Sequence, residues 1–285
     1  MMLFSRPLTA RLAAPSDRNA IQTLTRFEQR VHAHLDWKPV EDWLGAQPFV
    51  VAERGQRMVG ALACPADLPE VAWVRLFVVA EDIAVEAVWR LLWPLAREAL
   101  IKQGLPAVAG LSLEAWTSPL FISAGFQHTH DVVVLNRPPG LSTPAPTDNV
   151  AQVRLARSED FGLISALDAE AFELPWRLSP AMVRLAISQA ECLSVAEREG
   201  QIVGYQLTTP SRGGAHLARV AVSPAHQGRG IGAALVSHLI DYYNRRGGCE
   251  ITVNTQHNNR ASLAVYQKLG FQLTGARFPV YQLSL

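Results

Sequence analysis

One stretch of the sequence decides how the rest is interpreted: Val220-Ala-Val-Ser-Pro-Ala-His-Gln-Gly-Arg-Gly-Ile-Gly-Ala233. β-Branched and small residues up to Val222 predict a strand, and a glycine-rich turn then opens a helix at Ile231. Glycine has no Cβ, so a backbone rich in glycine can approach a ligand closely. The unpaired N–H groups of a first helical turn also favour anions. The stretch therefore predicts a pyrophosphate-binding loop, with Arg229 as a nearby cation.

The same loop formally fits a dinucleotide-binding fingerprint, Gly228-x-Gly230-x-x-Ala233. In a Rossmann fold, however, the first glycine directly follows the strand, whereas residues 223–227 intervene here. The acidic residue of that fold should end the second strand, but Glu250 begins it. We therefore exclude a Rossmann fold. On this stretch alone, a glycine-rich turn without a ligand stays an alternative.

The segments around the loop alternate between strand and helix patterns. The predicted strands are 192–197, 202–208, 215–222 and 250–255, with two closing strands at 271–273 and 280–283. The predicted helices are 163–172, one that follows Ser179-Pro180, 231–245 and 260–269. Apolar spacing and glycines at helix ends support these assignments. We expect an α/β fold in which helices flank a mixed, mostly antiparallel sheet.

An internal repeat indicates that this arrangement occurs twice. Val51-Ala-Glu-Arg54 recurs as Val195-Ala-Glu-Arg198 with an offset of 144 residues, and so does Val59-Gly60 as Val203-Gly204. A repeat of this length has the size of a domain, so it indicates a duplication rather than a solenoid. Residues 138–148 hold four prolines and one glycine, which is typical of a linker. We expect domains at 1–137 and 151–285, joined by a linker at 138–150.

Two signatures of the second half resemble the GCN5-related N-acetyltransferases, the GNAT superfamily. Gln227-x-x-Gly230-x-Gly232 is similar to the acyl-CoA loop of that family. The segment from Asn259 through Tyr266 to Gly270-Phe271 is similar to its second signature, Asn-x-x-(Ala/Ser)-x-x-x-Tyr-x-x-x-Gly-Phe. The resemblance covers 151–285. It implies two tandem GNAT-like domains and an acyl-CoA-dependent N-acyltransferase that uses acetyl-CoA as co-substrate and no metal.

The resemblance also implies which residues hold the cofactor. In the family, the strand before the loop splays from its neighbour, and its backbone pairs with the pantetheine amides. One backbone N–H of that strand also stabilises the oxyanion. The implied cofactor-binding residues are Val220, Val222, Gln227, Gly228, Arg229, Gly230, Ile231, Gly232, Ala233, Asn259, Ser262 and Tyr266.

Two side chains are candidates for proton transfer. Tyr266 is the implied general acid, because a phenol with a pKa of ~10 can protonate a thiolate whose pKa is ~8.5. His216 is a candidate base, since several family members place Glu or His there and histidine titrates near neutral pH. It shares an even-numbered strand face with Val220 and Val222, so it should face the cleft unless a bulge shifts the register. The alternatives are that Tyr266 only packs in the core, and that His216 is a half-buried strand histidine without a catalytic role.

The acceptor is predicted only as a small-molecule or peptide amine. The ribosomal-protein N-terminal acetyltransferases resemble the chain in Phe172-x-x-Pro175-Trp176 and in Ala215-His-Leu217. Their acidic base would align with Asn254, and an amide cannot accept a proton, which argues against this acceptor class. We therefore keep it only as an alternative. A non-catalytic acyl-CoA-binding sensor module is the alternative from another class.

The first half keeps the predicted order of strands and helices but lacks the residues expected to bind the cofactor and to donate a proton. Its strand at 71–80 is followed by Glu81-Asp-Ile-Ala-Val-Glu86, which has no glycine. Three carboxylates stand where a pyrophosphate would bind, and like charges repel. Phe121 takes the place of Tyr266 and has no proton to donate. We expect residues 1–137 to be a degenerate copy that does not bind acyl-CoA.

Composition and charge limit the partners, metal sites and cellular location that we expect. The 285 residues carry a net charge of +1, and the two halves hold 13 basic and 15 acidic against 13 basic and 10 acidic residues. This balance gives no reason to expect a nucleic-acid partner. The three cysteines lack metal-ligand spacing. The longest apolar run, 85–101, is broken by charges and a proline, and the N-terminus lacks a signal-peptide pattern. We expect a cytoplasmic protein without membrane contact; oligomeric state is unknown from the sequence.

Overall fold

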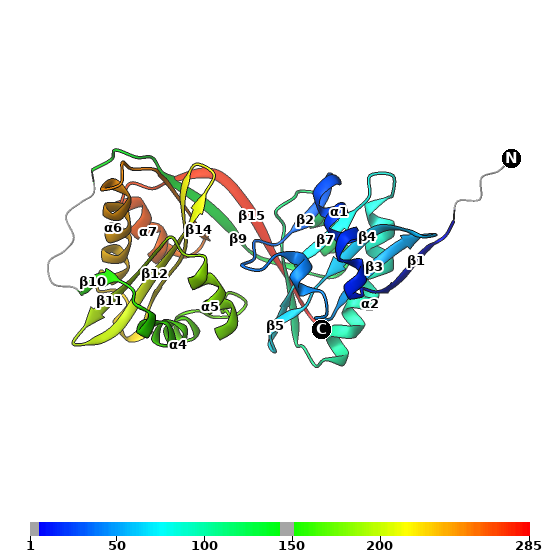
Figure 1. Ribbon diagram of the computed structural model, residues 1–285, viewed down its shortest axis with the longest axis horizontal. Coiled ribbons are helices and arrows are strands. Elements are labelled where there is room, and N and C mark those ends of the chain that lie inside the picture. The colour runs from blue at the N-terminus through cyan, green and yellow to red at the C-terminus, as the bar shows by residue number, and fades with distance from the viewer. Residues whose placement is uncertain (1–5, 143–150) are drawn as a thin grey trace. The chain divides into compact units, whose positions relative to one another are not determined.

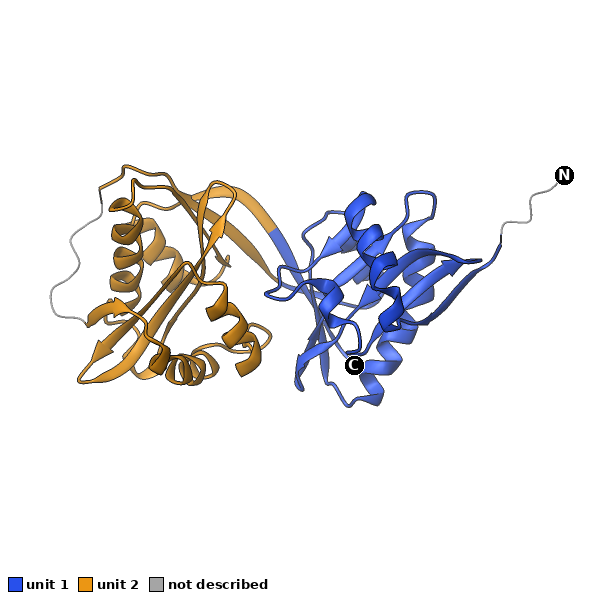
Figure 2. Cartoon of the chain, viewed as in Figure 1, with its two compact units in different colours: residues 1–129, 278–285 blue, residues 130–277 orange. Residues whose placement is uncertain are grey.

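The computed structural model describes residues 6–142 and 151–285 of the chain. It divides into two compact units (Figure 2): unit 1 comprises Met1–Thr129 with Phe278–Leu285, and unit 2 comprises His130–Arg277. Most of the predicted linker at 138–150 lies outside the described residues. Within the described ranges, no helix combines the length and the apolar character that crossing a membrane requires.

Unit 2 is a sheet with helices on both faces, as the sequence predicts (Figure 1). Its strands pair in the order β10-β11-β12-β13-β14-β9, and only β13 and β14 are parallel. Its elements are β10 (Gln152–Leu155), α4 (Phe161–Ala171), α5 (Pro180–Ser188), β11 (Cys192–Arg198), β12 (Gln201–Ser211), β13 (Gly214–Val222), α6 (Ile231–Asn244), β14 (Glu250–Gln256), α7 (Arg260–Lys268) and β15 (Gln272–Ser284).

Unit 1 repeats this α/β layout with additional short strands. One of its sheets has the order β1-β3-β4-β7-β2. Its elements are β1 (Leu8–Leu12), α1 (Arg18–Phe27), β2 (Arg30–Ala33), β3 (Phe49–Arg54), β4 (Arg57–Ala63), β5 (Ala66–Leu68), β6 (Val71–Trp73), β7 (Leu76–Val79), α2 (Val85–Lys102), β8 (Ala107–Leu111), α3 (Thr117–Ser123) and β9 (Gln127–Arg137).

The two copies share a local ion pair that the repeat contains. Arg11 Nη1 lies 2.6 Å from Asp17 Oδ2, and Arg154 Nη1 lies 2.7 Å from Asp160 Oδ2. In both copies the arginine lowers the pKa of the aspartate, chiefly through its hydrogen bonds. The pattern Arg-Leu-Ala-x-x-x-Asp occurs at 11–17 and again at 154–160. Its structural role is to join the first strand to the turn before the first helix.

The last strand of each sequence half completes the other unit. Residues 132–137 of β9 run antiparallel to β14, although they belong to the first half of the sequence. Residues 280–284 of β15 run antiparallel to β8 of unit 1. The prediction of two separate closing strands is wrong, because β15 continues through Gly275 and Pro279. Proline does not interrupt this strand, since its carbonyl still accepts a hydrogen bond from Ser112 N (2.8 Å).

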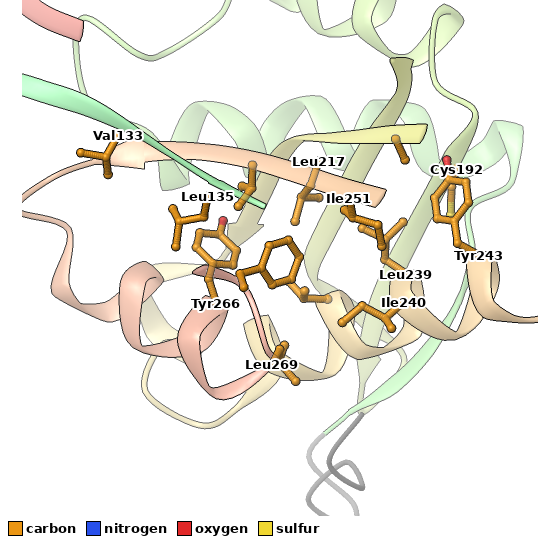
Figure 3. Packing of buried hydrophobic residues seen from close by; sticks show 14 residues of the cluster. Val133, Leu135, Cys192, Leu217, Leu239, Ile240, Tyr243, Ile251, Tyr266 and Leu269 are labelled. Atoms are coloured by element: carbon orange, nitrogen blue, oxygen red, sulfur yellow. The ribbon is translucent and has the colours of Figure 1, made fainter. Parts of the chain in front are cut away.

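The main core of unit 2 depends on the strand from the first half. Figure 3 shows Leu135 of β9 next to Tyr266, and Val133, Leu217 and Leu269 belong to the same buried cluster. All five side chains are buried, and Leu135 is fully so. The first half of the sequence therefore contributes to the folding of the unit that holds the candidate site.

Replacing Leu135 by alanine is expected to destabilise unit 2. Truncating a fully buried leucine costs about 2–5 kcal/mol, through lost transfer free energy and the cavity that remains. The matched control is Leu273→Ala, because that side chain is 54% exposed and should cost no more than about 0.5 kcal/mol. Urea denaturation of the full chain measures both. Equal unfolding midpoints for the two variants would show that β9 is not part of this core.

Candidate functional site

The site begins where β13 and β14 separate. The two strands pair in parallel only between residues 214–217 and 250–253. Beyond that point β14 continues to pair with β9 up to Gln256. Within the described ranges, residues 218–222 of β13 have no strand partner on this side. The splay that the family resemblance implies is therefore present in this chain.

The hydrogen bonds of β13 show which backbone groups face the open edge. Ser223 N donates to Val203 O of the neighbouring β12 (2.9 Å). In an antiparallel pair, hydrogen-bonded residues alternate with residues whose N–H and C=O point the other way. Ala221 and Arg219 therefore bond to β12 in the same manner. The N–H and C=O groups of Val220 and Val222 are directed to the open edge, where an extended ligand could pair with them.

The loop that follows β13 adopts the backbone conformation that its glycines allow. Gly228 and Gly230 have φ values of 73° and 83°, in a region that side chains other than glycine rarely adopt. Gln227 ties the loop to the strand, because its Nε2 donates to Val222 O (3.1 Å). The turn therefore places the first residues of α6 next to the end of β13.

The first amides of α6 are available to an anion. The first helical hydrogen bond of α6 runs from Ala234 N to Gly230 O (3.0 Å). The N–H groups of Ile231, Gly232 and Ala233 precede it and have no intrahelical acceptor. They lie at the positive end of a helix of 14 residues, where a phosphate is favoured.

The space beside the loop fits a bulky anion. A Cβ built on Gly228 would meet no atom within 4 Å, and one on Gly232 would meet only Val222 Cγ2 at 3.9 Å. Arg229 is exposed, and none of the described residues forms an ion pair with it. The loop thus combines open space, unpaired amides and a cation, which fits a pyrophosphate.

Tyr266 lies on α7 with its ring in the core of unit 2 (Figure 3). The residue is 6% exposed, and its ring centroid lies 5.6 Å from that of Phe271. Burial raises the pKa of Tyr266 above its usual value. The phenol is therefore protonated throughout the neutral range, which is the state that a general acid requires.

Asn259 and Ser262 serve the helix that carries Tyr266. Asn259 is the N-cap of α7, and its Oδ1 accepts a hydrogen bond from Ser262 N (3.1 Å). An N-cap of this kind stabilises a helix by about 1 kcal/mol. The structure therefore assigns Asn259 a positioning role for α7, and the cofactor contacts of both residues stay predictions.

His216 does not share a face with Val220 and Val222, because β13 contains a bulge. Leu207 of β12 pairs with Arg219, but the next residue, Thr208, pairs with Leu217. The residue between them, Ala218, is the extra one, and such an insertion reverses which side chains face each side.

The packing on the two sides of β13 confirms this reversal. Leu217, before the bulge, and Val220, after it, both pack in the cluster formed with α6 and α7. Arg219 contacts α4 on the opposite face, which is also the face of His216. The expected common face for the base and the two valines is therefore wrong.

His216 is held by its neighbours on β14. Its Nδ1 lies 2.9 Å from Thr252 Oγ1, and that hydroxyl donates to Ala215 O (3.3 Å). Because the hydroxyl has one proton, Thr252 accepts from Nδ1–H, which leaves Nε2 as the basic nitrogen. Burial lowers the pKa of His216, and a hydrogen bond with the Asn254 side chain acts in the opposite direction. The imidazole is therefore neutral at neutral pH and able to accept a proton.

The same face of β13 carries a buried ion pair between Arg219 and Asp168, called the anchor below, which the sequence did not indicate. Arg219 Nε donates to Asp168 Oδ2 of α4 (2.6 Å), and the Tyr205 hydroxyl donates to the same oxygen. The Arg219 guanidinium also lies 3.8 Å from the ring centroid of Phe172 and bonds to Trp176 O (3.3 Å). This anchor fixes the segment 172–176 over the face that carries His216.

Comparison with known proteins identifies the family of the second half. Residues 161–271 match the model of the family described as Acetyltransferase (GNAT) family. This range contains the splayed strand, the loop, His216 and Tyr266.

Curated relatives match parts of the same region. An uncharacterised N-acetyltransferase of Methanocaldococcus jannaschii is 29% identical over 121 residues, which are 42% of this chain and 77% of that protein. N-acetyltransferase family 8 member 3 of Mus musculus is 33% identical over 33% of this chain and 44% of that protein. The ribosomal protein bS18-alanine N-acetyltransferase of Escherichia coli K12 is 34% identical over 26% of this chain and 50% of that protein. The chain therefore spans half or less of the length of the last two proteins.

Solved structures share the fold over nearly the whole chain. A GCN5-related N-acetyltransferase from Sphaerobacter thermophilus is 19% identical, with a TM-score of 0.66 over 98% of this chain and 97% of that chain. A tandem GNAT protein from the clavulanic acid biosynthesis pathway is 17% identical, with a TM-score of 0.65 over 98% of both chains. These similarities confirm the predicted fold of two GNAT-like units.

Proposed function

Since residues 161–271 match the model of the Acetyltransferase (GNAT) family, we propose that unit 2 transfers an acetyl group from acetyl-CoA to a primary amine. The observation that carries this proposal is the open edge of β13, where Val220 and Val222 direct their backbone groups away from β12. A pantetheine amide can pair with such an edge as a neighbouring strand would.

The loop and the edge would hold the two ends of the co-substrate. The amides of residues 228–233 and Arg229 would bind the pyrophosphate, and Val220 and Val222 would align the pantetheine arm. When bound, acetyl-CoA supplies an activated acetyl thioester. A backbone N–H on this edge would stabilise the negative charge that develops on the thioester oxygen.

The candidate base and acid lie on opposite faces of the separated strands. His216 is on the face that α4 covers, and Tyr266 packs from the other face with α7. Direct attack requires a base at the amine on one side of the carbonyl carbon and an acid at the leaving sulfur on the other. His216 Nε2 would accept the amine proton, and the Tyr266 hydroxyl would protonate the departing thiolate. The arrangement supports one ternary complex without a covalent enzyme intermediate.

A second acceptor class is supported by one observation. The chain resembles the ribosomal protein bS18-alanine N-acetyltransferase of Escherichia coli K12, so the N-terminus of a protein is a candidate acceptor. His216 pairs with Thr252 on β14, two residues before Asn254, the position where the acidic base of that class would align. A histidine beside Asn254 could supply the base that the amide cannot.

Thiol release from acetyl-CoA tests the proposed function and the acceptor class together. The full chain would be incubated with acetyl-CoA and panels of small primary amines, amino acids, polyamines and peptides that begin with alanine. We expect amine-dependent thiol release with at least one panel, and the responding panel identifies the acceptor class. Tight acetyl-CoA binding without turnover on any panel would favour a sensor module and contradict the enzyme assignment.

The pH dependence of turnover tests the role of His216. Because the pKa of His216 is lowered from 6.5, kcat/KM should fall only below about pH 6.5, where the imidazole becomes protonated. His216→Gln should lower kcat/KM at pH 7 about 100-fold and remove this acidic limb. The matched control is His238→Gln, since the pKa of that histidine is also lowered but it lies on α6. An unchanged acidic limb in His216→Gln would exclude His216 as the base.

A further inference from the structure

Unit 1 has a counterpart of the open edge, and the strand register locates it. Val59-Gly60 and Val203-Gly204 are repeats of each other. Gly60 of β4 pairs with Val79 of β7, and Gly204 of β12 pairs with Val222 of β13. Strand β7 (Leu76–Val79) is therefore the counterpart of residues 219–222, the part of β13 that forms the open edge.

The same register shows that the counterpart of the candidate base is lost. Ala72 and Trp73 of β6 pair with Val108 and Ala109 of β8, as residues 215 and 216 pair with 251 and 252 in unit 2. Trp73 therefore takes the place of His216, and Ala109 takes the place of Thr252. The base and the residue that orients it are both absent from unit 1.

In unit 1 the open edge is filled by the chain itself. Strand β2 (Arg30–Ala33) runs antiparallel to β7 on the side away from β4, with Arg30 opposite Val79 and His32 opposite Phe77. The pairing extends beyond β2, because His34 N donates to Arg75 O (2.8 Å). The connection between the first helix and the next long strand thus forms an added strand here, whereas in unit 2 it forms α5.

Strand β2 uses the backbone groups that correspond to Val220 and Val222. Ala80 N donates to Val59 O of β4 (2.9 Å), so alternation directs the N–H and C=O groups of Phe77 and Val79 away from β4. His34 and Arg75 are a hydrogen-bonded pair, and in an antiparallel ladder every second pair is hydrogen-bonded. His32 with Phe77 and Arg30 with Val79 are therefore hydrogen-bonded pairs as well. The backbone of β2 therefore satisfies the groups that a pantetheine arm would satisfy in unit 2.

A carboxylate binds the turn that follows this filled edge. Glu28 Oε2 accepts a hydrogen bond from Glu81 N (2.9 Å), the second amide after the end of β7 at Val79. Arg30 Nη1 donates to Ile83 O a little further along the same turn (3.3 Å). Glu28 and Arg30 thus both bind the turn that replaces the phosphate loop. His32 is fully buried, so β2 is an integral part of the unit.

We propose that the segment 28–34 is an internal ligand that permanently occupies the acyl-CoA slot of unit 1. The strand β2 replaces the pantetheine arm, and the Glu28 carboxylate holds the segment to the turn that follows β7. Unit 1 is therefore held in the ligand-filled form of the fold without any cofactor, and the chain has one acyl-CoA site. This inference rests on the proposed function only for the statement that acyl-CoA pairs along β13.

Amide hydrogen exchange of the full chain, with and without saturating acetyl-CoA, tests this proposal. The amides of His32 and His34 should exchange slowly in both states and should not respond to acetyl-CoA. The amides of Val220 and Val222 should become protected only when acetyl-CoA is present. Fast exchange at His32 and His34, or a change there on adding acetyl-CoA, would overturn the internal-ligand assignment. No response at Val220 and Val222 would instead overturn the proposed function, so the two failures are distinguishable.

A variant tests the carboxylate contact separately. Glu28→Ala should speed exchange at the Glu81 amide at least about tenfold, because it removes the charged acceptor of that N–H. The matched control is Glu86→Ala, which removes another carboxylate near the same turn. Equal exchange at Glu81 in the wild type and in Glu28→Ala would contradict the assignment of Glu28.

Discussion

Gly232→Glu is expected to abolish acetyl-CoA binding and leave the fold intact. Gly232 lies in the first turn of α6, where a Cβ meets only Val222 Cγ2 at 3.9 Å. A glutamate there is favourable for the helix dipole, and unit 1 already has Glu86 in the first turn of its equivalent helix. The same carboxylate would repel a pyrophosphate at the loop. We expect at least about 100-fold weaker binding, or about 2.7 kcal/mol, by isothermal titration.

The control for this variant places the same charge at the start of α2. Ala84 is the N-cap residue of α2 and is exposed, so Ala84→Glu changes the net charge equally without touching unit 2. It should bind acetyl-CoA as the wild type does. If Gly232→Glu also bound normally, with an unchanged unfolding midpoint, the loop would not be the pyrophosphate site.

Tyr266→Phe is expected to lower kcat about 100-fold, with little change in the affinity for acetyl-CoA. The phenol loses only its hydroxyl, so the packing against Phe271 is kept. Unit 1 has Phe121 at the equivalent position, fully enclosed by its core, which indicates that this fold accepts phenylalanine here. A general acid contributes about 10²–10⁴-fold to a rate, and steady-state kinetics with the best acceptor measures the loss.

A second tyrosine provides the matched comparison. Tyr242 lies on α6, and its hydroxyl donates to Glu191 O (3.4 Å), away from the open edge of β13. Tyr242→Phe should retain the wild-type kcat. A Tyr266→Phe enzyme with unchanged kcat would show that another group, or water, protonates the leaving thiolate.

The fold and the phosphate loop were predictable because their signals are local. A β-branched strand followed by Gln227-Gly-Arg-Gly-Ile-Gly232 specifies a turn with positive φ at Gly228 and Gly230, and the structure has it. The repeat was equally visible, since identical residues recur at one spacing. The acidic turn at Glu81 predicts in the same way that the first copy has no anion site, and this stays a prediction.

The strand exchange and the filled edge depend on pairings that are distant in sequence. The run of apolar residues at 132–135 identifies a strand, but nothing local says whether it pairs with β8 or with β14. Likewise, Arg30-Val-His-Ala33 is a short segment without a strong strand pattern, and only the vacant edge of β7 makes it a strand. Tertiary context decides such cases, because strand propensity is weak compared with the gain from pairing and burial.

The face of His216 could not be predicted because a bulge changes the parity of a strand by one residue. Ala218 carries no sequence signal for this irregularity, and the shift is visible only in the pairing of Leu207 and Thr208 with β13. The anchor of Arg219 on Asp168 was missed for a related reason. A charged residue within a strand indicates solvent exposure unless its partner, 51 residues away, is known.

The number of acetyl-CoA molecules that bind per chain tests the central claim most directly. Isothermal titration of the full chain should show one site, since unit 2 has an open edge with a phosphate loop and β2 fills the equivalent edge of unit 1. The Gly232→Glu variant should then show none. Two sites per wild-type chain would contradict the filled slot of unit 1. The absence of any binding would contradict the assignment of unit 2 as an acetyl-CoA-dependent transferase.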